Sequence, residues 1–352
     1  MHVQKTYQIL NKTICLLFDN SELAHAFHKD YQAFEMEKNC RCGQINITQT
    51  GFFLEINGKA IDFSEHPLPS QYAFQVIVSE IMSQFDDFYL IHAGVVQYHD
   101  STLILAGPPG IGKSTLTHKL INNGFTFFSD DCAPLHKTTG LIHPFPRSMW
   151  MVDSSQKNQS SAFRSKNPIP VYQSSFSKKP QQPDIVICVM NKNSKENSIH
   201  LNISLKSSKN PLIDALKKMN NVHIHQRHKQ FPEYRISYES CEAISQNIQQ
   251  LCLDHKQYVW QIYRVNPSRP CFDRLSSIIP VSAHEAASII IPEMKLFDSF
   301  LNPRKNESVM ASMLSISKHF QKSRCFYMTP GTLDSEFHCI NSCVQRFLQK
   351  DV

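Results

Sequence analysis

The chain has 352 residues, of which 41% are hydrophobic and 19% are charged, and its formal net charge is +6 at pH 7. This is an ordinary globular balance, so the chain is expected to bury a real core in one large domain or two. The Lys and Arg residues are scattered rather than gathered into a basic stripe, so nucleic acid is not an expected partner, whereas a weakly basic surface suits an anionic ligand.

The sequence has neither the pattern of a signal peptide nor that of a membrane span. The short apolar run near the N-terminus is broken by Asn11 and Lys12, and no run of about 18 or more apolar residues follows. The 11 cysteines are scattered, without the paired C-x-x-C spacings of a zinc site. We therefore expect most of them to be small buried side chains of a cytoplasmic protein that has no membrane partner.

Residues 1–66 predict a small N-terminal α+β region. A helix is predicted over 21–34, with Ser21 as its N-cap. The segment 52–63 has Asn57-Gly58 at its centre, a dipeptide that supplies the two positive φ angles of a type I′ turn. This segment is therefore expected to form a β-hairpin.

A larger domain is predicted over residues 67–252. Apolar residues at helical spacing predict a helix over 71–85. The strands predicted at 89–96 and 102–106 are joined by a short turn, which makes them an antiparallel hairpin. Residues 153–183 are rich in Ser, Gln, Asn, Lys and Pro and are interpreted as a long mobile loop.

The remaining residues, 253–352, are interpreted as a C-terminal α/β extension. A strand and helix at 325–347 echo a strand and helix at 231–251, which end a unit at 184–252. A duplicated unit and chance similarity between two ordinary strand–helix pairs explain this echo equally well.

One stretch, residues 107–114, fits the motif G-x-x-x-x-G-K-[ST] at every fixed position. It lies between the predicted strand 102–106 and a predicted helix over 115–121, which is the setting that this phosphate-binding loop requires. Lys113 is expected to reach the β- and γ-phosphates, and the Ser114 hydroxyl is expected to bind Mg²⁺. The alternative is a Gly/Pro-rich loop that binds nothing. The motif predicts that a nucleotide triphosphate is bound by Gly107, Pro108, Pro109, Gly110, Ile111, Gly112, Lys113, Ser114 and Thr115.

Two adjacent carboxylates, Asp130 and Asp131, close the next predicted strand, 125–128. Successive side chains of an extended segment point in opposite directions, so the two are expected to have different roles. One is a candidate ligand of Mg²⁺, and the other is a candidate general base for the attacking hydroxyl. The alternative is a polar pair at a turn or at a helix N-cap.

His92 lies in the predicted strand 89–96. A lone His on an apolar strand is more often a core residue than a catalytic one. Its position argues for function, because neighbouring strands of one sheet end near the same phosphate.

The stretch His-x-Gly-Val at 92–95, the loop at 107–114 and the hydrophobic stretch ending at Asp131 resemble the HPr kinase/phosphorylase family, in particular its shorter members, the HPr kinase-related kinases. His92 precedes the loop by 15 residues, and Asp131 follows the loop lysine by 18 residues, as the corresponding His and Asp of that family do. The resemblance covers residues 88–147 and continues more faintly through 184–252.

The resemblance implies a role for each matching residue. Asp131 resembles the proton acceptor, His92 the active-site histidine near the phosphates, and Lys113 the phosphate-binding lysine. Ser114 resembles a Mg²⁺ ligand, which leaves Asp130 as the second candidate ligand of the metal.

Arg147 ends a His-Pro-Phe-Pro-Arg stretch that resembles one in the related kinases. Its planar donors suit a phosphate or a substrate. The alternative is a surface arginine beside a proline-kinked turn.

The chain also departs from the family. Gln156 stands where the family has a metal-binding Glu, and the segment that supports dephosphorylation is not recognisable. The resemblance therefore implies neither phosphorylase activity nor HPr as the substrate.

The function implied is an ATP-dependent kinase that acts on a serine of a protein or peptide or on a small-molecule hydroxyl. A non-catalytic ATP-binding regulatory or scaffold protein is the alternative, and the sequence leaves a homo-oligomer open. A GTPase is ranked last, because Ser194 stands where a guanine-reading motif has Asp. The expected fold is α/β, with the mixed, bent sheet of HPr kinase and phosphoenolpyruvate carboxykinases in place of the doubly wound parallel sheet that the motif alone suggests.

Overall fold

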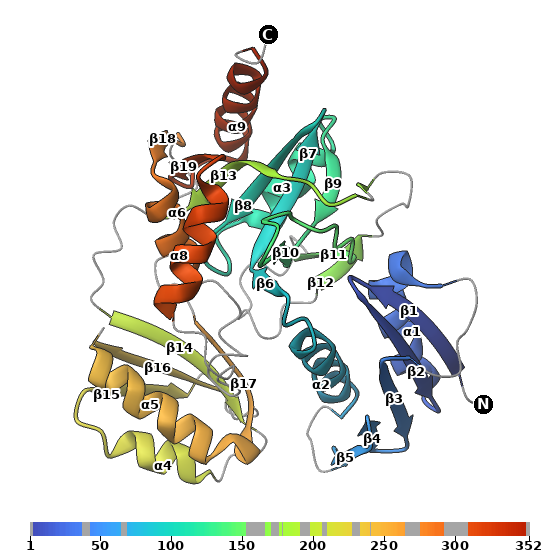
Figure 1. Cartoon of the computed structure of the whole chain (residues 1–352). Coiled ribbons are helices and arrows are strands. Elements are labelled where there is room, and N and C mark those ends of the chain that lie inside the picture. Colours follow the sequence, from blue (N-terminus) through green and yellow to red (C-terminus); the bar gives the residue numbers. More distant parts are fainter. Residues whose placement is uncertain are drawn as a thin grey trace.

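The computed structural model describes residues 3–36, 43–64, 69–152, 166–169, 176–177, 179–190, 198–205, 210–226, 233–239, 241–264, 275–291 and 309–349. Within these ranges the strands form a five-stranded, a six-stranded and a four-stranded sheet and two separate strand pairs. Helices cover the sheets (Figure 1). The predicted α/β class is confirmed.

The N-terminal residues form the five-stranded sheet, whose strands lie in chain order: β1 (Val3–Ile9), β2 (Lys12–Phe18), β3 (Ile45–Thr50), β4 (Phe53–Ile56) and β5 (Lys59–Asp62). Only the β2–β3 pair is parallel. The hairpin predicted between β4 and β5 is confirmed, and Asn57 (φ 48°) and Gly58 (φ 84°) form its turn.

Between β2 and β3 lies α1 (Ser21–Tyr31), followed by a 3-10 turn, η1 (Gln32–Phe34). The prediction that Ser21 caps this helix is wrong. Asn20 is the cap, and its side chain accepts hydrogen bonds from the backbone N–H groups of Glu22 and Leu23 at 2.9 and 3.1 Å. Asn and Ser are equally good caps, so residue type alone does not choose between neighbours.

Helix α2 (Pro69–Ser83) lies beside the N-terminal sheet in Figure 1. Buried side chains of α1, α2 and the sheet form one hydrophobic cluster, which also contains Phe145. We call β1–β5, α1, η1 and α2 the N-terminal unit. Its core extends past residue 66, where the sequence places the end of the region.

The six-stranded sheet is the centre of the molecule. Its order is β18 (Ile278–Val281), β19 (Arg324–Met328), β13 (Pro183–Val189), β8 (Ser101–Ala106), β7 (Ala93–Tyr98) and β9 (Thr126–Ser129). Strands β8, β13 and β19 are parallel, and β7, β9 and β18 are each antiparallel to their neighbours. The predicted mixed sheet, with an antiparallel strand before the 107–114 loop, is confirmed.

Helices cover both faces of this sheet. Side chains of α3 (Lys113–Ile121) and α9 (Leu333–Leu348) share a hydrophobic cluster with one face. Those of α6 (Ala283–Ile290) and α8 (Val309–Phe320) share a cluster with the other face. The last described residues therefore complete the central layer.

Two antiparallel pairs accompany the central sheet: β6 (Phe88–Ile91) with β10 (Ala133–His136), and β11 (Met149–Val152) with β12 (Lys166–Ile169). Strand β12 falls within the segment 153–183, so the prediction of a continuous mobile loop is wrong for its residues. The stretches 153–165 and 170–175, including Gln156, lie outside the described residues, as does the partial motif at 191–194.

The remaining strands form a separate antiparallel sheet in the order β15 (Val222–Gln226), β16 (Glu233–Glu239), β14 (Ser198–Leu205) and β17 (Val259–Arg264). Two helices, α4 (Pro211–Lys217) and α5 (Glu242–Asp254), share its hydrophobic cluster, and a 3-10 turn, η4 (Lys256–Tyr258), precedes β17. The chain order is β-α-β-β-α-β, the connectivity of a split βαβ unit.

Strand pairing therefore groups residues differently from the predicted ranges. Strand β17 lies past the expected boundary at residue 252 yet completes the four-stranded sheet, while β18 and β19 return to the central sheet. The two strand–helix segments that echo one another, at 231–251 and 325–347, belong to these different sheets.

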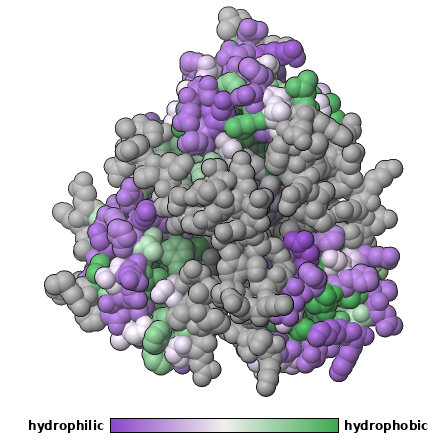
Figure 2. All heavy atoms as spheres, turned by 180° about the vertical axis from the view of Figure 1, so that it is seen from behind, coloured by the Kyte–Doolittle hydropathy of each residue, from purple (hydrophilic) through white to green (hydrophobic). Residues whose placement is uncertain are grey.

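In the view from behind, the hydrophobic side chains of the described residues form small groups among hydrophilic ones (Figure 2). No described helix combines the length and apolar character needed to cross a membrane.

Candidate functional site

The loop from Gly107 to Ser114 joins the end of β8 to the start of α3, so the predicted strand and helix on its two sides are confirmed. A Cβ on Gly107 would lie 2.4 Å from the carbonyl oxygen of Val189 in the neighbouring strand β13. Gly112 precedes the helix with φ 104°. Only glycine fits both positions without strain.

Lys113 folds back over the loop. Its Nζ donates hydrogen bonds to the carbonyl oxygens of Gly107 and Pro108 at 2.6 and 3.1 Å, and the residue is 7% exposed. A phosphate oxygen is a stronger, charged acceptor for the same donors. Of the other loop residues, Pro108 and Ile111 are buried, Pro109, Gly112 and Ser114 are half-buried, and Gly110 and Thr115 are exposed.

Beside this loop, two neighbouring segments each pass from the β6–β10 pair into the six-stranded sheet or back. The chain passes from β6 to β7 at His92, and the partner segment passes from β9 to β10 through residues 130–132. The pairing is regular at Ile91 with Ala133 and again at Val95 with Ser129. Between these two pairs, residues 92–94 do not pair with residues 130–132, so these side chains can make other contacts.

Asp131 meets His92 in this gap. Its Oδ1 lies 2.9 Å from Nε2 of His92, and the two side chains are 60% and 22% exposed. Asp131 has φ 67°, in the left-handed region that Asp tolerates better than most residues. Because Ala93 pairs with Ala106, His92 lies level with Gly107, where the loop begins. The His–Asp pair is therefore at the mouth of the loop.

Asp130 has different surroundings and is only 4% exposed. A Cβ on Gly94 would lie 3.6 Å from its Oδ1 and 2.3 Å from Oγ1 of Thr117, so these three residues converge. Thr117 and Ser114 are three residues apart on α3 and are therefore neighbours on the helix surface. Asp130 thus approaches the side of α3 that carries Ser114.

The chemistry of these donors fits Mg²⁺ held together with a nucleotide. Within the described ranges, no group of three or more His, Cys, Asp or Glu residues is arranged to hold a metal ion. Asp130 and Ser114 offer one carboxylate and one hydroxyl. This small set suits Mg²⁺, which usually keeps waters and substrate phosphate oxygens beside one or two protein ligands.

Arg147 is held by α1. Its Nε donates a hydrogen bond to Oδ2 of Asp30 at 3.0 Å, and its Nη2 donates to the same oxygen. The guanidinium carbon lies 4.9 Å from the centre of the Tyr31 ring. Burial acts to lower the pKa of this guanidinium, but the neighbouring Tyr31, Asp30 and Asp131 raise it overall. Arg147 is therefore not the surface arginine of the alternative interpretation.

Sequence reasoning missed Asp30 and Tyr31. The Arg147–Asp30 bond joins residues 117 positions apart, a separation that no local pattern reports. One signal was present: Asp30 lies on the buried face of α1 with Leu23, Phe27 and Tyr31. An acidic residue on the apolar face of a helix needs a buried partner.

The chain matches no protein-family model, and no curated protein matches it.

Proposed function

We propose that this chain is an ATP-dependent kinase that transfers the γ-phosphate to a hydroxyl group, on a serine of a protein or peptide or on a small molecule. The observation that carries the proposal is the His92–Asp131 pair at the mouth of the Gly107–Ser114 loop. Support also comes from the resemblance of these residues to the HPr kinase-related kinases, and from the mixed sheet in which an antiparallel strand leads into the loop.

The proposed reaction is a single displacement at the γ-phosphorus. The acceptor oxygen attacks this phosphorus, the new P–O bond forms, and the bond to the β–γ bridging oxygen breaks, so that ADP leaves with the bonding electrons. Asp131 takes the proton of the acceptor hydroxyl, and His92 holds the Asp131 carboxylate in place for it.

The loop residues bind the phosphates in this scheme. Lys113 exchanges its bonds with the loop carbonyls for bonds with phosphate oxygens, and the N-terminus of α3 adds partial positive charge. Asp130 and Ser114 would hold Mg²⁺, which would offset negative charge on the phosphates. Arg147 is not assigned a phosphate contact, because Asp30 engages two of its donors.

The test is phosphoryl transfer from γ-labelled ATP, with a cell lysate and a panel of hydroxyl metabolites as acceptors. Asp131→Asn is expected to lower transfer by about 10²-fold or more while ATP still binds. Lys113→Ala is expected to weaken ATP binding. ATP binding without transfer to any acceptor would support the non-catalytic ATP-binding protein instead, and unchanged affinity in Lys113→Ala would remove the loop from either function.

A cytoplasmic location is part of the same proposal. Most of the described cysteines are buried, as small apolar side chains of a cytosolic protein usually are.

A further inference from the structure

A short segment connects the N-terminal unit with the candidate site. We call residues His143–Ser148 the strap. Phe145 donates its backbone N–H to the carbonyl of Phe128 at 3.1 Å, and it forms a parallel bridge with Ser129, at the end of β9. Arg147 follows Phe145 by two residues, and Asp131 follows Ser129 by two residues. Asp131 lies near enough to the Arg147 guanidinium to contribute to the rise of its pKa.

The N-terminal unit holds the strap from its other side. The backbone N–H of Ser148 donates to the carbonyl oxygen of Asp30 at 3.1 Å, and its hydroxyl donates to that of Lys29 at 2.7 Å. The rings of Phe145 and Phe34 are 5.2 Å apart. Backbone, hydroxyl and ring contacts therefore fix the strap against the end of α1.

The Asp30 carboxylate then fixes the direction of the Arg147 side chain. A guanidinium is a rigid plane with donors at set angles, so two hydrogen bonds determine its orientation. The Tyr31 ring supports its face. The Arg147 and Asp30 side chains are 11% and 0% exposed, and a charge buried to this extent requires a partner of opposite sign.

We infer that the N-terminal unit forms part of the phosphoryl-transfer site, with Asp30 as a positioning residue that keeps Arg147 from taking Asp131 as its partner. With Asp30 in place, the Asp131 carboxylate stays on His92 and faces the loop. Without it, the buried guanidinium pairs with the carboxylate that the strap brings beside it, and Asp131 is withdrawn from the acceptor hydroxyl. The kinetic consequence rests on the proposed kinase activity, whereas the contact between His92 and Asp131 does not.

The kinetic test compares Asp30→Asn with the double variant Asp30→Asn/Arg147→Met. In Asp30→Asn, kcat is expected to fall about 10- to 100-fold, as for a misplaced reacting group, while KM for ATP stays within about twofold. The double variant removes the competing guanidinium, so most of the lost kcat is expected to return. The control Glu35→Gln removes another carboxylate of the N-terminal unit, one paired with Lys5, and is expected to leave kcat unchanged.

A double variant that folds, as judged by circular dichroism, yet is no more active than Asp30→Asn would overturn the inference. If Asp30→Asn does not fold, the double variant alone tests the inference. The inference then requires that the double variant folds and that its kcat stays within about tenfold of that of the parent chain.

A second readout does not need activity. With ¹³C-labelled histidine, the ring signal of His92 is assigned by its disappearance in His92→Gln. Asp30→Asn is expected to shift this signal, and Glu35→Gln and the double variant are expected to leave it in place. An unshifted His92 signal in folded Asp30→Asn would refute the positioning role. Absence of transfer in the parent chain would refute only the kinase proposal.

Discussion

Two of the ion pairs that involve the N-terminal unit have different surroundings. The Lys5 and Glu35 side chains are 32% and 28% exposed, whereas those of Arg147 and Asp30 are 11% and 0% exposed. Water stabilises the charges of the first pair whether or not they are in contact. The buried charges of the second pair are stabilised mainly by their contact with each other. The pair that depends most on its partner is the one that joins the unit to the candidate site.

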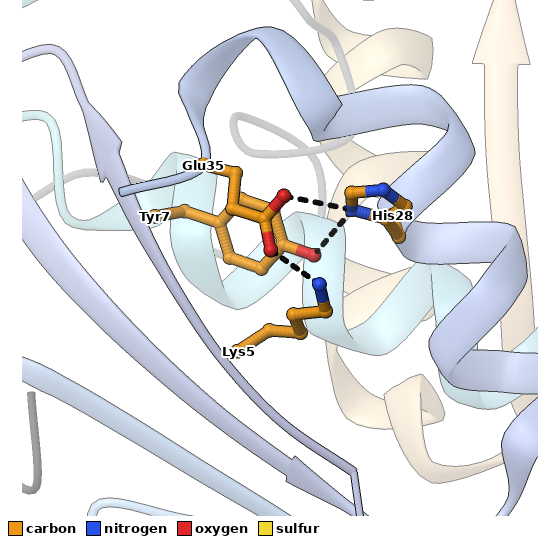
Figure 3. Close-up of polar contacts among 4 residues, drawn as sticks. All are labelled: Lys5, Tyr7, His28 and Glu35. Carbon is orange, nitrogen blue, oxygen red and sulfur yellow. Dashed lines mark hydrogen bonds and ion pairs between the residues drawn. The ribbon is translucent and has the colours of Figure 1, made fainter. Parts of the chain in front are cut away.

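The more exposed pair belongs to a cluster within the unit (Figure 3). Nδ1 of His28 lies 3.7 Å from Oε2 of Glu35, and the Tyr7 hydroxyl lies 3.5 Å from the same nitrogen. Burial, with a contribution from Glu35, raises the pKa of Tyr7 above its ordinary value. All four residues come from β1, α1 and the residue that follows η1, so this cluster stabilises one unit and does not connect it to another.

The largest expected effect is the loss of one partner of the buried pair. Arg147→Met leaves the Asp30 charge buried and unpaired, so the free energy of unfolding is expected to fall by about 3–5 kcal/mol. Urea unfolding measures it. Arg147→Met/Asp30→Asn is expected to recover most of the loss, and an equal loss in the double variant would show that packing, not charge, is responsible.

A buried carboxyl that forms no ion pair with the described residues extends the comparison. Glu336 is 4% exposed. Burial raises its pKa from 4.5 to about 7, and the Gly331 N–H, 3.0 Å from its Oε1, offsets part of this shift. Between these pH values the unfolded chain has lost a proton that the folded chain keeps, so stability falls as the pH rises, by up to about 3 kcal/mol.

Glu336→Gln is expected to remove this fall. Urea unfolding at pH 4 and pH 8, on the two sides of the window, measures it. Parallel pH profiles of the two proteins would contradict the assigned cause.

A substitution at the candidate site that changes packing but no charge can be compared with these charge changes. In Gly94→Ala the new Cβ lies 2.3 Å from Oγ1 of Thr117, which forces α3 away from β7 and is expected to cost about 1–3 kcal/mol. Because no charge changes, urea unfolding at low and at high salt is expected to give the same loss. A loss that depends on salt would indicate a rearranged Asp130 instead.

The smallest effect is expected at the exposed pair. Glu35→Gln is expected to lower the free energy of unfolding by less than about 1 kcal/mol, and salt is expected to reduce the difference further. Urea unfolding at two salt concentrations measures it. A loss as large as that of Arg147→Met would mean that exposure does not separate the two pairs.

Local sequence signals predicted the parts of the fold that depend on neighbouring residues. Asn57-Gly58 specified its hairpin, and the strand and helix around Gly107–Ser114 are where the motif places them. The turn before Ser101 made β7 and β8 antiparallel. In each case the deciding residues lie within a few positions of one another.

The parts that were missed depend on residues far apart in the chain. The apolar spacing of α2 predicts a helix but does not say that it packs on the N-terminal sheet. Likewise, nothing near Asp30 indicates Arg147, and nothing in β17 indicates that it pairs with β14. The sequence assigned different roles to Asp130 and Asp131. It did not indicate the left-handed backbone of Asp131 (φ 67°), which lies where the chain passes from β9 to β10 beside the passage from β6 to β7.

The parallel pairing of β19 with β13 also determines the order in which the chain can fold as it is made. The N-terminal unit has its sheet and both helices once α2 has left the ribosome. The central sheet has to wait for β19 and α9, more than a hundred residues after β13. During that interval the edge of β13 that later pairs with β19 has no partner strand, and unpaired apolar edges are prone to aggregate. We expect nascent chains that stop before residue 324 to need a chaperone.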